Sequence, residues 1–187
     1  SLIAILKSNI IFKNESVVVI NKPVGLASHG GSGLSLGLIE AVRQMEAKFK
    51  DAQLVHRLDR ETSGCIVLTL KRSVLRKLNE ELRNGTVEKK YLAVVKGKWP
   101  IKLNKVNLNL KKNILRSGER EVQINSKGKE AKTNFRLIKT SSNLSLIECE
   151  LLTGRTHQIR VHTSNLGYPI IGDKKYGDKD LNKKFRL

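Results

Sequence analysis

Aromatic side chains are scarce in this chain, at 4% of its 187 residues. A surface with many base-stacking platforms is therefore excluded, and any contact with nucleic acid is expected to be mainly electrostatic. Long hydrophobic runs are also missing, since no stretch approaches the roughly 18 apolar residues that suggest a membrane span. The sequence thus predicts a protein that is not embedded in a membrane, and we expect it in the cytoplasm.

Cysteine is nearly absent as well, with Cys65 and Cys149 alone. Both lie in apolar, strand-like runs, which favours small buried side chains in a reducing cytosol over a disulfide framework. The four histidines have no cysteine partner at zinc spacing, and His157 and His162 are five residues apart, a poor fit to one helical face. No metal site is predicted.

A glycine-rich loop at residues 29–33 follows a strand-like run and precedes a helical pattern, as in many nucleotide-binding proteins. Leu36 stands where the third glycine of G-x-G-x-x-G belongs, and the motif G-x-x-x-x-G-K-[ST] is absent. The sequence therefore predicts neither a nucleotide nor another small-molecule cofactor.

Acidic residues are few compared with basic ones: 17 Asp and Glu stand against 36 Lys and Arg, for a formal charge of +19. A compact body with this excess repels itself, so a polyanionic partner is expected. Nucleic acid is the first candidate and an anionic membrane surface the second. The apolar fraction of 39% indicates a globular chain rather than a disordered one.

Hydrophobic patterning predicts many strands and few helices. Strands are expected at residues 10–21 (as two short strands), 64–70, 86–97, 106–110, 122–124, 131–137 and 144–152. Helices are expected over residues 36–48, over 73–84 with Ser73 as N-cap and Gly85 as its stop, and over 156–166 with Thr156 as N-cap and Gly167 as its stop. Residues 111–129 are polar and basic and suggest an exposed hairpin arm. Such irregular alternation predicts an α+β fold with a mixed, mostly antiparallel sheet flanked by helices.

Residues 56–64 place one carboxylate, Asp59, between two arginines, Arg57 and Arg60, in a short loop before a buried strand. A surface cluster of ion pairs is the simpler interpretation of such a run. The loop is polar, however, and it ends in Thr-Ser-Gly turn chemistry at a strand entrance. This arrangement can hold an ionised aspartate rigidly among cations, which suits electrophilic sugar chemistry next to phosphates.

A second segment, residues 152–162, carries a turn at Thr153 and Gly154 followed by a helix start. Such a turn with a helix N-terminus is a potential anion site. If Thr156 caps the helix, Arg160 lies one turn further along on the same face.

These two segments are recognisable together. The sequence resembles the RluA family of pseudouridine synthases along nearly its whole length, and the family signature H-R-L-D-R-x-T-S-G is complete at residues 56–64. Three further blocks agree in order, at residues 21–25, 90–93 and 153–160. The glycine-rich loop and the arm at residues 112–120 are similar to the RluC subgroup, which modifies uridines in large-subunit (23S) ribosomal RNA.

The resemblance implies an RNA pseudouridine synthase with one catalytic domain and an RNA cleft across its sheet. We expect it to need no cofactor and to be a monomer. Asp59 matches the family's essential aspartate, Tyr91 the tyrosine that stacks on the target base, and Arg160 the arginine that pairs with the aspartate. Arg57 matches the arginine thought to fill the space left by the flipped nucleotide. The other residues expected to contact RNA are Arg60, Arg155, His157 and Lys22; Ile159 and Leu152 neighbour an aliphatic site position.

The chain differs from the family pattern at its two ends. Residues 1–9 are expected to be a linker or the remnant of an upstream domain, and residues 10–187 the catalytic domain, incomplete at its C-terminus. Two rival functions remain open. A non-catalytic RNA-binding or ribosome-assembly protein explains the charge equally well, but gives no reason for a carboxylate among arginines. A metal-dependent nuclease needs a cluster of acidic ligands, and Asp59 has only Glu61 nearby.

Overall fold

The computed structural model describes residues 1–31 and 36–185. The chain forms two compact units, Ser1–Thr86 and Val87–Leu187, and each is described by itself. Helices and antiparallel strands make up both units, so the predicted α+β class is confirmed. Every strand pair in the described residues is antiparallel; no parallel pair is found there to match the mixed sheet that the sequence suggested.

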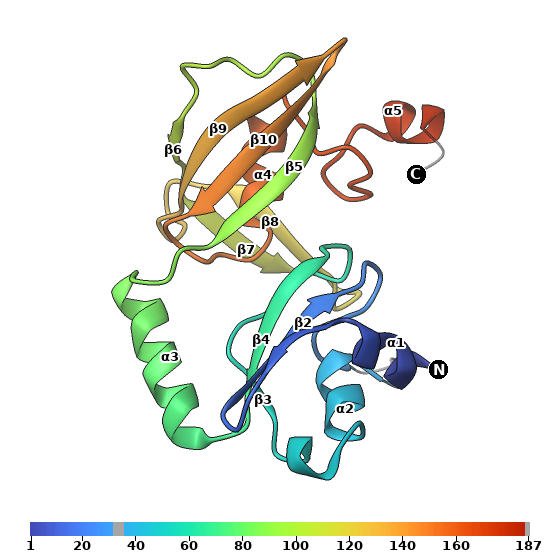
Figure 1. The fold of residues 1–187 in the computed structure, drawn as a ribbon. Helices are drawn as coiled ribbons and strands as arrows, with labels where there is room; N and C mark the ends of the chain where they lie inside the picture. Colours follow the sequence, from blue (N-terminus) through green and yellow to red (C-terminus); the bar gives the residue numbers. More distant parts are fainter. Residues whose placement is uncertain (32–35, 186–187) are drawn as a thin grey trace. The chain divides into compact units, whose positions relative to one another are not determined.

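The first unit is a four-stranded sheet with helices (Figure 1). Its strand order is β1-β2-β4-β3. In chain order its elements are α1 (Leu2–Ser8), β1 (Ile10–Lys13), β2 (Val17–Lys22), α2 (Leu38–Arg43), a 3-10 turn (Ala47–Phe49), β3 (Gln53–Leu54), β4 (Gly64–Thr69) and α3 (Arg72–Asn84).

Buried side chains of β2, β4 and α2 make up the core of this unit. Ile20 pairs with Ile66 and Val18 with Leu68, and all four side chains are fully buried. Because side chains alternate along a strand, this register gathers the branched residues on one face of the sheet. Residues 1–9, for which the sequence suggested a linker or remnant, include helix α1, which packs on α2 and β2 and buries Leu6 completely.

Several local expectations for this unit were wrong. The helix expected over residues 36–48 is α2 followed by a separate 3-10 turn. Helix α3 starts one residue before Ser73, and its N-cap is Lys71. The predicted end of this helix is confirmed, since Gly85 follows it in a left-handed conformation (φ 71°). Cys65 is exposed, since it lies on the face of β4 opposite Ile66. The glycine-rich loop lies partly outside the described residues.

The second unit contains a four-stranded sheet of order β5-β10-β9-β6 and a separate two-stranded hairpin, β7-β8. Its elements are β5 (Lys90–Lys96), β6 (Lys105–Asn107), β7 (Leu110–Ile114), β8 (Arg120–Ile124), β9 (Lys132–Ser141), β10 (Leu144–Leu151), α4 (Gln158–Asn165) and α5 (Lys179–Lys184). The hairpin corresponds to the arm expected at residues 111–129, although Val122 on β8 is buried.

The main core of the second unit is aromatic. Trp99 packs against Phe135 at 4.8 Å and against Tyr168 at 5.2 Å between ring centroids, both tilted. Val95 and Ile147 complete the buried cluster from the paired strands β5 and β10. Tilted pairs at these distances add to the free energy gained by burying the rings.

A fully buried histidine, His162, connects helix α4 to the strands. Its Nδ1 lies 3.0 Å from the Thr133 hydroxyl, which itself accepts a hydrogen bond from the Gln158 amide, and its Nε2 lies 2.9 Å from the Leu108 carbonyl. A neutral ring that carries its proton on Nε2 satisfies all these partners. Burial lowers the pKa of His162, against a smaller opposite effect of the Leu108 carbonyl.

This lowered pKa predicts a pH-dependent stability. Because the unfolded chain takes up a proton near about pH 6.5 and the folded chain resists it, the free energy of unfolding should fall as pH drops below that value. The slope is at most about 1.4 kcal/mol per pH unit. Between about pH 6.5 and 5, urea titrations should show the fall in wild type and in His29→Gln, an exposed-histidine control, and a smaller fall in His162→Gln. An equal fall in His162→Gln would refute this assignment.

Candidate functional site

The loop that carries Asp59 lies between β3 and β4 and is anchored in the core by Leu58. The Leu58 side chain is buried, and the buried Ser28 hydroxyl donates to its carbonyl at 2.7 Å and accepts from its N–H at 3.0 Å. Next to it, the half-buried Asp59 accepts a hydrogen bond from the N–H of Thr62 on its own carbonyl, which closes a turn. One side chain thus fixes the backbone immediately before the carboxylate.

Lys22 has a different role from the RNA contact that the sequence suggested. Its side chain is fully buried (0% exposed), and its ammonium donates to the carbonyls of Pro23, Leu26 and Arg60 at 3.1, 2.6 and 3.1 Å. An ammonium has three N–H donors, so these carbonyls can use all of them. Burial lowers the pKa of Lys22, against the opposing effect of the Glu61 and Asp59 carboxylates. Lys22 therefore acts as an internal tie.

The segment that follows β2 and the Asp59 loop are joined a second time, through Arg60. The Gly25 N–H donates to the Arg60 carbonyl, and the Arg60 Nε donates to the Gly25 carbonyl, each at 2.9 Å. Gly25 has a φ of 84°, a conformation that residues with a side chain rarely adopt. On the strand side, the His56 Nε2 accepts from the Val67 N–H at 3.1 Å. Arg57 is exposed on this framework.

The second group of site residues begins where β10 leads into α4, and its organiser is Gln158. The buried Gln158 carbonyl accepts from the Arg155 N–H and the Thr153 hydroxyl, and its amide donates to the Lys132 carbonyl and the Thr133 hydroxyl, all at 2.9 Å. The Gln158 amide thus occupies one N–H group, that of Arg155, in the turn that was expected to bind an anion.

The helix start in this segment also differs from the prediction. The N-cap is His157 rather than Thr156, and His157 has left-handed backbone angles (φ 54°, ψ 23°). The turn is closed by Gln158, so no capping hydroxyl is needed. Arg160 therefore lies in the first turn of α4, and Gly167 follows the helix with a φ of 87° as expected.

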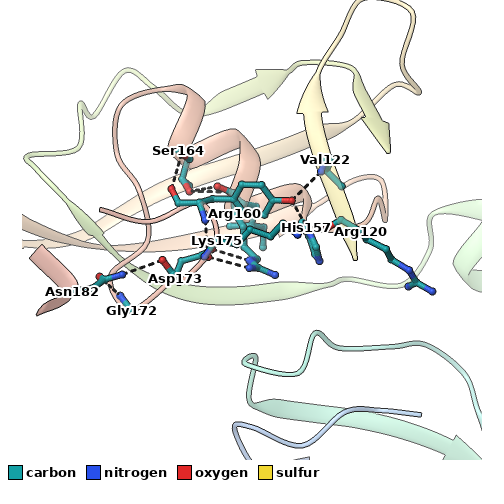
Figure 2. Close-up of polar contacts among 12 residues, drawn as sticks. Arg120, Val122, His157, Arg160, Ser164, Gly172, Asp173, Lys175 and Asn182 are labelled. Atoms are coloured by element: carbon teal, nitrogen blue, oxygen red, sulfur yellow. Dashed lines mark hydrogen bonds and ion pairs between the residues drawn. The ribbon is translucent and has the colours of Figure 1, made fainter. Parts of the chain in front are cut away.

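Arg160 forms a two-pronged ion pair with Asp173, drawn in Figure 2. The distances are 2.8 Å from Nε and 3.0 Å from Nη2 to the two carboxylate oxygens, and the side chains are 21% and 4% exposed. Burial alone would raise the pKa of Asp173. Arg160 and the backbone N–H groups of Tyr176 and Lys175 outweigh that effect, so the pKa is lowered. Asp173 is ionised and keeps the guanidinium in one orientation.

Tyr176 covers the same guanidinium and links it to the hairpin. The Arg160 guanidinium lies 5.1 Å from the centre of the Tyr176 ring, within cation–π range. The Tyr176 hydroxyl accepts from the Val122 N–H at 3.0 Å and contacts the His157 Nδ1 at 2.8 Å. The neighbouring Lys175 reaches the hairpin too and pairs with Glu119 at 2.6 Å. The orientation of Arg160 is therefore coupled to strand β8.

The remaining expected site residues lie on the same unit as Arg160. Tyr91 on β5 and Ile159 on α4 are half-buried, and both pack against the aromatic core cluster. Leu152 is 50% exposed just after β10. Arg155 is exposed, and its Nε donates to the Glu130 carbonyl at 2.9 Å.

Comparison with known proteins identifies the family. The family model for RNA pseudouridylate synthases matches residues 16–165. The chain belongs to the RNA pseudouridylate synthase family. Ribosomal large subunit pseudouridine synthase C of Haemophilus influenzae is 47% identical over 97% of this chain, and the protein of the same name from Escherichia coli (strain K12) is 44% identical over 97%. The chain spans 56% and 57% of the length of these two relatives.

Solved structures show the same fold. Human RNA pseudouridylate synthase domain containing 4 matches with a TM-score of 0.77 and 29% identity, over 95% of this chain and 72% of that one. Human RNA pseudouridylate synthase domain containing 1 matches with the same TM-score and 25% identity, over 94% and 72%. In the described part of the chain, no helix has the length and apolar character of a membrane span.

The Arg160–Asp173 pair predicts a large stability effect. Asp173→Asn removes the carboxylate that holds a mostly buried guanidinium by two oxygens, which should cost about 3–5 kcal/mol of unfolding free energy. Asp178→Asn is the matched control in the same unit, since Asp178 caps α5 and pairs with Lys96, and asparagine still caps a helix. It should cost much less, because water screens this partly exposed ion pair. Urea unfolding measures both, and equal losses would contradict the assignment.

Proposed function

We propose that this chain isomerises specific uridines of large-subunit (23S) ribosomal RNA to pseudouridine, with Asp59 as the catalytic carboxylate. Family membership and the names of the curated relatives support the reaction and the RNA class. The observation that carries the assignment of Asp59 is its loop, which is tied down on both sides of the aspartate, by Ser28 at Leu58 and by the buried Lys22 at Arg60. A surface ion-pair cluster needs no such internal support.

The proposed reaction breaks the N1–C1′ bond, turns the uracil, and joins its C5 to C1′. The proton on C5 is lost to solvent, and N1 gains one. Nothing is oxidised or reduced, so the reaction calls for no redox cofactor or activated donor. Asp59 starts it by one of two routes: its carboxylate attacks C1′, or it removes a proton from the neighbouring sugar carbon. Both routes require the Asp59 carboxylate to be ionised when the reaction begins.

The supporting residues have distinct proposed roles. A target within paired RNA must first be flipped out, at a cost of a few kcal/mol. Arg57, exposed on the Asp59 loop, would fill the vacated space. Tyr91 would stack on the uracil, a contact worth roughly 1–3 kcal/mol. Arg60, Arg155 and His157 would contact the RNA backbone around the target.

Arg160 is proposed to pair with Asp59 in the active enzyme, at about 4 Å or less. A guanidinium has five N–H donors in a planar fork, and Asp173 binds it through two nitrogens, Nε and Nη2. One arginine can therefore serve two carboxylates. In this arrangement Asp173 would set the plane of the guanidinium, and Arg160 would in turn orient the catalytic oxygens.

We further propose that the enzyme acts in the cytoplasm as a monomer, without a metal ion or a cofactor. The redox-neutral reaction supports the last point. The rival function, a non-catalytic RNA-binding or ribosome-assembly protein, shares the high charge. It differs in one measurable respect, because it releases no proton from C5 of uridine.

Asp59→Asn is the decisive substitution. It keeps the size and most hydrogen bonding of the side chain but removes the charge, so RNA binding should persist while turnover falls by at least about a thousandfold. Tritium release from ribosomal RNA transcripts labelled at C5 of uridine measures turnover, and filter binding measures affinity. Glu61→Gln is the control, since it removes an exposed carboxylate two residues away. Turnover by Asp59→Asn at the level of this control would reject the proposal.

A further inference from the structure

The start of helix α3 carries charges of the wrong sign for a helix N-terminus. Lys71 is the N-cap and Arg72 the first helical residue, the first turn contains no acidic side chain, and no side chain caps the backbone N–H groups. The N-terminal end of a helix bears a partial positive charge and favours anions, so cations here oppose folding. Local violations of this kind are expected where function requires them.

These two cations line a hollow of about 640 Å³ in the first unit. Arg43 and Lys50 line it as well, and Asp51 is the one carboxylate among its lining residues. A second hollow of about 450 Å³ shares Arg72 with the first and adds Arg76 and Asn79 from the next turns of α3. We call the two hollows together the α3 groove.

Four cations of the α3 groove have no counter-ion at ion-pair distance in the described part of the chain. Among residues 1–31 and 36–185, no ion pair or side-chain hydrogen bond is found for Lys50, Lys71, Arg72 or Arg76. Elsewhere in this unit Lys13 and Lys48 both pair with Glu46. The groove thus concentrates positive charge next to a helix end that also attracts anions.

A buried hydroxyl provides an independent sign of a missing partner. Thr69, the last residue of β4, lines the hollow and is 1% exposed, and its hydroxyl oxygen has no hydrogen-bond partner in the described part of the chain. It lies on the face of β4 opposite the core residue Leu68, because side chains alternate along a strand. A buried polar group without a partner is uncommon and destabilising unless a ligand or water satisfies it.

We propose that the α3 groove binds the phosphate backbone of the RNA substrate, as an anion site separate from the Asp59 loop. Strand β4 runs from the end of that loop at Gly64 to the groove at Thr69, roughly 17 Å at about 3.3 Å per residue. Arginine forks, lysine ammonium groups, helix N–H groups and a hydroxyl are the groups that hold phosphate oxygens. Only the identity of the phosphate source rests on the proposed function.

The test is a double substitution, Lys71→Gln with Arg72→Gln. The matched control is Lys98→Gln with Lys102→Gln, which removes two exposed cations that also have no ion pair among the described residues. The affinity for a ribosomal RNA transcript is measured across a range of salt concentrations. We expect the groove variant to lose about 1–2 units of the log–log slope, at about 0.7–0.9 per phosphate contact, and the control to lose less than half a unit.

Stability separates binding from folding. Removing cations from the helix start should leave the melting temperature unchanged or raise it. Thr69→Val removes the unsatisfied hydroxyl at nearly the same volume, so it should raise the melting temperature while it weakens RNA binding by a few fold. Weaker binding in a protein that is equally or more stable cannot come from misfolding. A lowered melting temperature with an unchanged salt slope would overturn the proposal.

Two further measurements distinguish RNA binding by the groove from a failure of the proposed catalytic function and from binding to an anionic membrane. Tritium release at limiting RNA should fall in the groove variant along with its affinity, whereas the Lys98→Gln/Lys102→Gln control should stay within about twofold of wild type. Wild-type protein that binds RNA but releases no tritium would refute the proposed function, while the slope comparison still decides on the groove. Binding to vesicles that contain phosphatidylserine is the last arm. Loss of vesicle binding with an unchanged RNA slope would assign the groove to an anionic membrane surface and overturn the proposal.

Discussion

The geometry of the Asp59 loop depends on one buried ammonium, that of Lys22. Taking a charge out of water costs several kcal/mol unless partners replace the water, and here three carbonyls replace it. Two of these carbonyls belong to the loop that follows β2, and the third belongs to Arg60. One ammonium therefore ties together two segments of the chain, since Lys22 and Arg60 are 38 residues apart. Ser28 adds a second tie at Leu58. The carboxylate between these two anchors stands on a backbone with little freedom to move, as pre-organised chemistry requires.

In the second unit, other polar side chains fix the positions of the proposed site residues. Gln158 uses both ends of its amide to close the turn before α4, and Asp173 holds Arg160 by both carboxylate oxygens. Tyr176 then connects the guanidinium to the hairpin through the Val122 N–H. In each unit, the residues proposed to meet the substrate are positioned by polar side chains that are themselves buried.

The strands of the first unit and the Asp59 loop could be predicted from the sequence. The period-2 pattern predicted β2 and β4, and a run such as H-R-L-D-R-x-T-S-G pointed to the Asp59 loop. The role of Lys22 was not predictable, because a lysine beside a Pro-x-Gly turn is normally exposed and only the fold brings three carbonyls around it. The shift of the N-cap from Thr156 to His157 was missed because a left-handed histidine leaves no trace in composition. Asp173 lies in a loop without periodicity, so nothing in the sequence linked it to Arg160.

The most direct test of this account is amide hydrogen exchange in Lys22→Met, which keeps the length of the side chain but removes its three donors. Under conditions where the variant stays folded, the Gly25 N–H, which donates to the Arg60 carbonyl, and the Thr62 N–H, which donates to the Asp59 carbonyl, should exchange much faster than in wild type. Lys13→Met, which removes an exposed ion pair with Glu46, should leave both rates unchanged. Wild-type exchange at Gly25 and Thr62 in Lys22→Met would contradict the claim that this ammonium fixes the loop.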